Sequence, residues 1–171
     1  MVLVRDATKD DLAAITAICN ALLETTTHEW SEIRHTVAER EEWLASQRAS
    51  GRPALVAVAA GEVVGCASYG DFRDSVKWPG YRFTVEHSIH VREDHWGRGI
   101  GRTLIEALVD RARREGKHVM VAAIDAANVR SIGFHERLGF VEVARMPEIG
   151  EKFGRRLDLV LMQRTLDAVP Q

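Results

Sequence analysis

Three glycines, Gly97, Gly99 and Gly101, stand at alternate positions directly ahead of a long amphipathic run. Glycine weakens a helix by about 1 kcal/mol relative to alanine, so helix propensity does not explain this start. The run has apolar residues at helical spacing and ends at Gly116, which is typical of a left-handed helix cap. A glycine turn that leads into a helix presents free N–H groups at the positive end of the helix dipole, with no Cβ atoms to block a ligand. The pattern predicts a phosphate site, and a flexible turn is the alternative that the glycines alone leave open.

Length and charge narrow the class of protein. The 171 residues predict a single domain, 1–171, with a core of its own. A hydrophobic fraction of 46% and a charged fraction of 28% indicate a globular chain. With 23 basic and 25 acidic residues there is no basic excess for nucleic acid or for a membrane surface, so we expect small-molecule partners. No apolar run matches a membrane-spanning helix and residues 1–11 lack the pattern of a secretion signal, which predicts a cytoplasmic protein.

Some segments of the chain have apolar residues at every second position, as in strands, and others have them three or four positions apart, as in helices. This pattern predicts a mixed α/β (α+β) domain. Helices are expected after a cap at Thr8, over about 37–50, from the glycines to Gly116, and over 128–138 ahead of Gly139. Strands are expected at 1–5, at 54–70 as a hairpin that turns at Ala60 and Gly61, and at 84–91, 118–124, 140–146 and 157–166.

Several common ligand motifs do not fit. The G-x-G-x-G spacing differs from the dinucleotide fingerprint G-x-G-x-x-G, and no Lys followed by Ser or Thr closes a P-loop. His87 and His90 are three apart on a predicted strand and so point to opposite faces, and no helix carries an H-x-x-x-H pair. Cys19 and Cys66 fall at apolar positions, which favours reduced, buried side chains over a disulfide or a metal pair. We therefore predict no metal.

Several separate stretches of the chain resemble one family. "WGRGIG" (96–101) is similar to the Q/R-x-x-G-x-G/A cofactor motif of the GCN5-related N-acetyltransferases, except at its first position. Stretches at 20–30, 67–73, 81–91, 116–128 and 135–163 resemble the phosphinothricin and methionine-sulfoximine acetyltransferases of that superfamily. The resemblance implies the GNAT fold, a mixed, mostly antiparallel sheet with helices on both faces and a splayed parallel pair at the acetyl-CoA site. It implies an enzyme that moves the acetyl group of acetyl-CoA to the α-amine of a small amino-acid analogue, by direct attack in a ternary complex.

The same resemblance implies where acetyl-CoA binds. The N–H groups of residues 97–102 would hold its pyrophosphate, with Arg98 or Arg102 adding charge. The preceding strand would contribute backbone groups to the pantetheine arm, and an Asn early in the 128–138 helix would contact the cofactor. The expected cofactor-binding residues are Ile89, His90, Val91, Trp96, Gly97, Arg98, Gly99, Ile100, Gly101, Arg102, Asn128 and Ser131.

Two side chains are the candidate catalysts. Glu86 lies in "TVEHS", where the resemblance places the general base, and a carboxylate can take the proton of an attacking amine directly or through one water. A solvated carboxylate is the alternative. His135 shares a helix face with Asn128 and Ser131 and stands where this superfamily has the residue that protonates the departing thiolate; a structural histidine is the alternative. Neither cysteine has a nucleophile setting, so no acetyl-enzyme is expected.

The substrate side follows from the resemblance as well. The family's substrates carry an α-carboxylate, for which Arg73 and Arg82 are the matching partners, beside Ser88 and a pocket wall at Trp30. Surface arginines and a core aromatic are the alternatives. The resemblance also implies a homodimer, and the apolar stretch 157–166 is consistent with a covered strand. Two other functions stay open, a non-catalytic acyl-CoA-binding regulatory module and an acetyltransferase for peptide or protein amines.

Overall fold

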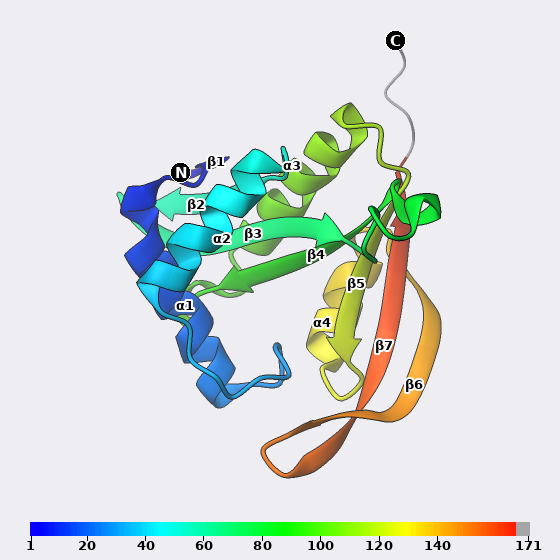
Figure 1. The fold of residues 1–171 in the computed structure, drawn as a ribbon. Helices are drawn as coiled ribbons and strands as arrows, with labels where there is room; N and C mark the ends of the chain where they lie inside the picture. The colour runs from blue at the N-terminus through cyan, green and yellow to red at the C-terminus, as the bar shows by residue number, and fades with distance from the viewer. Residues whose placement is uncertain (167–171) are drawn as a thin grey trace.

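A seven-stranded sheet runs through the molecule in the order β1-β2-β3-β4-β5-β7-β6 (Figure 1). The structure is a computed structural model and describes residues 1–166. Its strands are β1 (Val2–Asp6), β2 (Ala54–Ala59), β3 (Glu62–Asp71), β4 (Thr84–Val91), β5 (Val119–Asp125), β6 (Val141–Lys152) and β7 (Arg155–Thr165). Its helices are α1 (Leu12–Thr25), α2 (Val37–Ala49), α3 (Ile100–Arg114) and α4 (Val129–Glu136). This is the mixed, mostly antiparallel sheet that the family resemblance implies.

The sheet contains one parallel pair, β4 with β5, and that pair is short. The two strands are in register only from Thr84 opposite Val119 to Glu86 opposite Val121. Beyond this point β4 stays paired with β3 as far as Val91, and β5 stays paired with β7 as far as Asp125. The strands therefore diverge, and the gap between them opens at the carboxyl end of both.

Helices cover the two faces of the sheet. The buried face of α3 consists of the six apolar residues that helical spacing predicts, Ile100, Leu104, Ile105, Leu108, Val109 and Ala112. They pack in one core with Leu55 and Ala57 of β2, whereas Ala54 and Val56 of the same strand pack with α1 and α2. Alternate residues of a strand point to opposite faces, so α3 lies across the sheet from α1 and α2.

The main departures from the predicted elements lie at two element ends. Thr8 precedes a 3-10 turn, Lys9–Asp11, and the N-cap of α1 itself is Asp11, so the predicted cap is wrong by one short turn. Strand β6 continues six residues beyond the predicted 140–146, to Lys152, through register shifts after Glu142 and Met146. No helix in residues 1–166 is long and apolar enough to cross a membrane.

Candidate active site

The first turn of α3 has no side chain that caps it. Gly99 is the N-cap residue with a φ of +80°, and Gly97 has a φ of +77°. An added Cβ at either position would meet nothing within 4 Å, so the left-handed backbone is what requires glycine there. Gly101 is different, because its Cβ would lie 3.1 Å from the ring of Phe134. The three glycines thus shape a bare helix start and let α3 pack closely on α4.

The loop between β4 and α3 is held by Trp96. Its indole N–H donates to the carbonyl oxygen of Val91 at 2.7 Å, and the Arg130 guanidinium lies 4.5 Å from the centre of its rings. Trp96 stands at the position where the family motif has Arg or Gln. Here it joins the end of β4, the glycine loop and α4, which fixes the loop by packing and one hydrogen bond.

A cavity of about 480 Å³ opens between the diverging strands and the first turn of α3. This volume lies within the usual range for small-molecule sites. From the predicted site it is lined by Ser88, Ile89, His90, Val91, Trp96, Gly97, Gly99, Ile100, Gly101, Arg102, Asn128, Ser131 and His135. The structure therefore brings together eleven of the twelve expected cofactor residues, and Arg98 is the one that does not line the cavity.

Helix α4 presents the second predicted constellation. The Asn128 side chain accepts from the Ser131 N–H at 3.0 Å, as an N-cap does. Nδ1 of His135 lies 2.8 Å from the Ser131 carbonyl oxygen, which can only accept, so Nδ1 carries the proton. Nε2 of His135 is then the acceptor for the Nε2–H of His87, at 3.2 Å. This arrangement fixes one tautomer for each ring.

The two histidines are buried and electrically neutral. Burial, with the nearby His135 as a second cause, lowers the pKa of His87 to about 3, and burial also lowers the pKa of His135. Nδ1 of His87 is the unprotonated nitrogen of that ring, and its lone pair has no hydrogen-bond partner within residues 1–166. Both rings line the cavity. An unpaired buried acceptor there is available to an N–H or S–H donor of a ligand.

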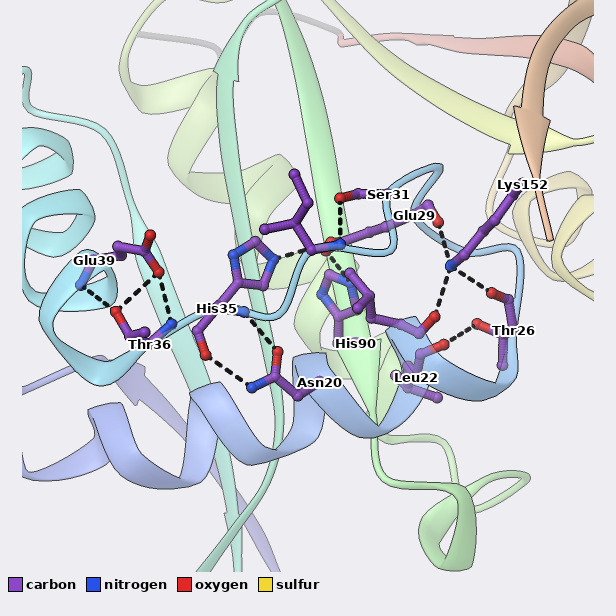
Figure 2. Close-up of polar contacts among 12 residues, drawn as sticks. Asn20, Leu22, Thr26, Glu29, Ser31, His35, Thr36, Glu39, His90 and Lys152 are labelled. Atoms are coloured by element: carbon purple, nitrogen blue, oxygen red, sulfur yellow. Dashed lines mark hydrogen bonds and ion pairs between the residues drawn. The ribbon is translucent and has the colours of Figure 1, made fainter. Parts of the chain in front are cut away.

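On the other face of β4, His90 reaches the loop after α1 (Figure 2). Its Nε2 lies 2.9 Å from one carboxylate oxygen of Glu29, and Nε2 of His35 lies 3.3 Å from the other. The hydrogen bond from His90 outweighs burial and lowers the pKa of Glu29 to about 2. Burial works against the charged imidazole, but its hydrogen bonds to Cys19 and Glu29 raise the pKa of His90 overall. Glu29 is therefore ionised and paired beside the cavity.

A buried lysine holds this loop in place. Nζ of Lys152, at the end of β6, donates to the carbonyl oxygens of Leu23, Thr26 and Glu29, each at 2.7 Å (Figure 2). The residue is only 1% exposed. Nearby, the ring of Trp30 lies directly on Gly150, where an added Cβ would collide with it. The β6–β7 hairpin thus supports the loop that carries Glu29.

Glu86 lies at the last paired position of β4 and β5. It is half-buried, and burial raises the pKa of its carboxyl group, which makes the carboxylate a stronger base. Its partner on β3 is Gly70, and a Cβ added to that glycine would meet no atom within 4 Å, so there is open space beside Glu86. Glu86 itself is not among the residues that line the cavity.

The predicted substrate residues are placed in two groups. Ser88 lines the cavity, whereas Arg73, Arg82 and Trp30 do not. Arg73 lies 5.5 Å from the ring centre of Tyr81, and Arg82 lies 4.3 Å from that of Phe83, so both arginines rest on aromatic rings in the exposed segment between β3 and β4. Trp30 packs on the β6–β7 hairpin instead.

Sequence reasoning missed His87 and Glu29 as parts of the site. His87 could have been found from its strand position, because it shares a face with Ile89, a predicted cofactor residue. Glu29 lies in an irregular loop, where no periodicity predicts the direction of a side chain.

Comparison with known proteins shows the family of this chain. Residues 15–140 match the family described as "Acetyltransferase (GNAT) family". The chain is 50% identical over 165 residues to the L-methionine sulfoximine/L-methionine sulfone acetyltransferase of Pseudomonas aeruginosa, a match that covers 96% of this chain and 94% of that protein. It is 37% identical to the phosphinothricin N-acetyltransferase of Alcaligenes faecalis, over 96% of this chain and 83% of that one.

A solved structure shows the same fold. YncA of Salmonella typhimurium, determined with its cofactor acetyl-CoA, superposes with a TM-score of 0.92 at 45% identity, over 97% of this chain and 94% of the other. The matched family covers most of the chain, and these relatives cover nearly all of it. The chain belongs to the acetyltransferase (GNAT) family.

Proposed function

We propose that this enzyme transfers the acetyl group of acetyl-CoA to the α-amine of a small amino-acid analogue of the methionine sulfone, methionine sulfoximine or phosphinothricin type. The observation that carries the proposal is that the glycine start of α3 and the gap between β4 and β5 open into the same cavity. The relatives named for these substrates support the choice of substrate class.

The residues present fit acetyl-CoA. Its pyrophosphate needs backbone N–H groups that are free of capping side chains, and the start of α3 offers them with no Cβ in the way. Arg102 and Arg130 line the same cavity and add positive charge. When bound, the thioester would supply an activated acetyl group, and the residues of β4 past its last pairing with β5 would hold it.

Glu86 is the proposed general base. An amine attacks only as the neutral form, and a carboxylate acting directly or through one water can remove its proton, with a gain of roughly 10²–10⁴-fold. Burial raises the pKa of Glu86, which brings it closer to the pKa of the substrate ammonium group whose proton it accepts. Because Glu86 stands beside the cavity wall, we expect one water between the carboxylate and the amine.

His135 is the proposed group that returns a proton to the departing thiolate. Its Nδ1–H is bound to Ser131 and its Nε2 accepts from His87, so in this state the imidazole directs no proton into the cavity. We propose that Nε2 of His135 receives the Nε2 proton of His87 and passes a proton to the departing sulfur. The unpaired Nδ1 of His87 takes up a proton from cavity water in exchange, so that both rings end neutral.

The substrate carboxylate needs a cation, because otherwise it is repelled by Glu86. Arg73 and Arg82 are the proposed partners, and both belong to the exposed segment between β3 and β4. We expect that segment to move toward the cavity when substrate binds, which releases the arginines from the rings of Tyr81 and Phe83.

We also propose that the chain acts as one domain and assembles as a homodimer in the cytoplasm. Strand β6 is an edge of the sheet and exposes five large apolar side chains on or beside it, Val141, Val143, Met146, Ile149 and Phe153. Exposed apolar residues along an edge strand are usually covered by a partner.

The test is a panel of amines assayed for release of free CoA. Methionine sulfone, methionine sulfoximine and phosphinothricin should be acetylated far faster than their decarboxylated counterparts and than peptide amines. Equal rates with and without the carboxylate would contradict the substrate class and favour a general amine or peptide acetyltransferase. Tight acetyl-CoA binding with no turnover of any amine would favour a regulatory module.

A further inference from the structure

Three buried side chains with metal-binding atoms meet behind the cavity wall. Cys19 comes from α1, Cys66 from β3 and His90 from β4, where Cys66 and His90 stand directly opposite each other. The two sulfur atoms and a ring nitrogen all lie within 4.8 Å of one another. The residues are 2%, 7% and 7% exposed. Sequence spacing could not predict this group, because its members are contributed by three separate elements.

The donor set has a definite chemical preference. Two thiolates and one imidazole favour Zn²⁺ and other thiophilic ions over Mg²⁺ or Ca²⁺, which prefer oxygen. Around a tetrahedral Zn²⁺ ion the ligand atoms lie about 3.5–3.8 Å apart, given Zn–S and Zn–N bonds of about 2.3 and 2.0 Å. The observed separations therefore need only small side-chain movements. Two thiolates also cancel the charge of the ion, which reduces the penalty of burying it.

Glu29 provides the support that a metal-binding histidine usually has. Its carboxylate lies 2.9 Å from Nε2 of His90, so Nδ1 is the nitrogen left for an ion. Metal-bound histidines commonly donate their other N–H to a carboxylate, which fixes the ring and its tautomer. Glu29 is itself positioned by His35 and by the contact of its carbonyl oxygen with Lys152 (Figure 2).

The cavity offers a route to this group, because His90 and Leu22, about one turn after Cys19, both line it. Three protein ligands leave a fourth position for water. We propose that Cys19, Cys66 and His90 bind one Zn²⁺ ion, with Glu29 orienting His90. The acetyl transfer described above needs no metal, so the ion is separate from that step and its binding does not depend on the proposed function.

The test uses Co²⁺ and Cd²⁺, whose bonds to thiolate give ultraviolet charge-transfer bands. Untagged, reduced protein without acetyl-CoA is titrated under anaerobic conditions, and free thiols are counted first. Because the chain has two cysteines in total, a thiolate band can come only from this group. We expect saturation at one ion per chain, and loss of the Co²⁺ band when Zn²⁺ is added.

Substitutions then identify the ligands. Cys19→Ala and Cys66→Ala should each weaken Cd²⁺ binding by more than about a hundredfold, and Glu29→Gln should weaken it by about 10–100-fold. His28→Gln, which changes an exposed histidine at the same cavity, is the matched control and should bind as the parent does. Circular dichroism and urea unfolding show whether each variant is folded.

Three results would overturn the proposal. One is the absence of a charge-transfer band in parent protein whose two thiols both titrate as free. Another is rapid loss of both thiols in air after reduction, at a rate that added Zn²⁺ does not slow, which would make the pair a disulfide instead. A band of unchanged intensity and affinity in both cysteine variants would also refute the site, because each variant lacks one of the two thiolates.

Discussion

Replacing Lys152 by methionine should destabilise the protein and disturb the loop that carries Glu29. Methionine keeps most of the length of the side chain but removes all three N–H donors. The carbonyl oxygens of Leu23, Thr26 and Glu29 then lose a partner that now lies at 2.7 Å from each. Because Leu23 and Thr26 belong to the end of α1, the helix loses its C-terminal cation as well.

The magnitude follows from these contacts. A hydrogen bond to a charged group contributes about 1.5–3 kcal/mol, so three such bonds have an upper limit of about 9 kcal/mol. Removing the charge also removes the penalty of burying an ammonium group, which is several kcal/mol. We expect a net loss of about 3 kcal/mol. With a urea m value of about 2 kcal/mol/M, the unfolding midpoint should fall by about 1.5 M.

Lys117→Met is the matched control for this experiment. Lys117 also donates to a carbonyl oxygen, that of Arg82, but it makes one such contact, at the surface. Its replacement should change the free energy of unfolding by less than about 0.5 kcal/mol. Equal urea midpoints for the Lys152→Met and Lys117→Met proteins would refute the reasoning, since buried contacts would then contribute no more than an exposed one.

Five further outcomes are expected. Gly99→Val should weaken acetyl-CoA binding by at least about tenfold in calorimetry. Gly51 also has a left-handed backbone with open space around it but does not line the cavity, so the Gly51→Val protein should bind acetyl-CoA normally. Glu86→Gln should keep acetyl-CoA affinity and lower kcat by about tenfold or more near neutral pH, with partial recovery as pH rises and more amine is neutral; full activity would remove Glu86 from the mechanism. In the parent enzyme, activity should fall as the pH drops through the raised pKa of Glu86, and this acid limb should be absent from the Gln variant's profile. Arg73→Ala should raise KM for methionine sulfone much more than it lowers kcat. Light scattering should give the mass of a dimer, and a monomer mass that does not change with concentration would contradict the proposed homodimer.

Local patterns in the sequence predicted the elements of the sheet and the glycine start of α3, and the family resemblance implied most of the other residues that line the cavity. The glycine spacing predicted the bare helix start, and the spacing of Asn128, Ser131 and His135 predicted their common face. The strand pattern at 84–91 matched β4 at both ends.

Long-range contacts could not be predicted in this way. The extension of β6 past Met146 passes through Pro147 and Gly150, which interrupt a strand pattern. A lysine at the end of that strand is expected at the surface, since lysine is seldom buried, yet Lys152 is 1% exposed. The meeting of Cys19 with Cys66 and His90 likewise depends on the packing of α1 against the sheet.

The reach of Lys152 also has a consequence for synthesis of the chain. Its contacts with the end of α1 and the loop that follows join residues 123 to 129 positions apart. During translation, the segment with Glu29 leaves the ribosome long before its support exists. We therefore expect nascent chains that end before β6 to lack transfer activity even if the glycine turn is already formed. The loop after α1 would be open to proteases until the β6–β7 hairpin has been synthesised.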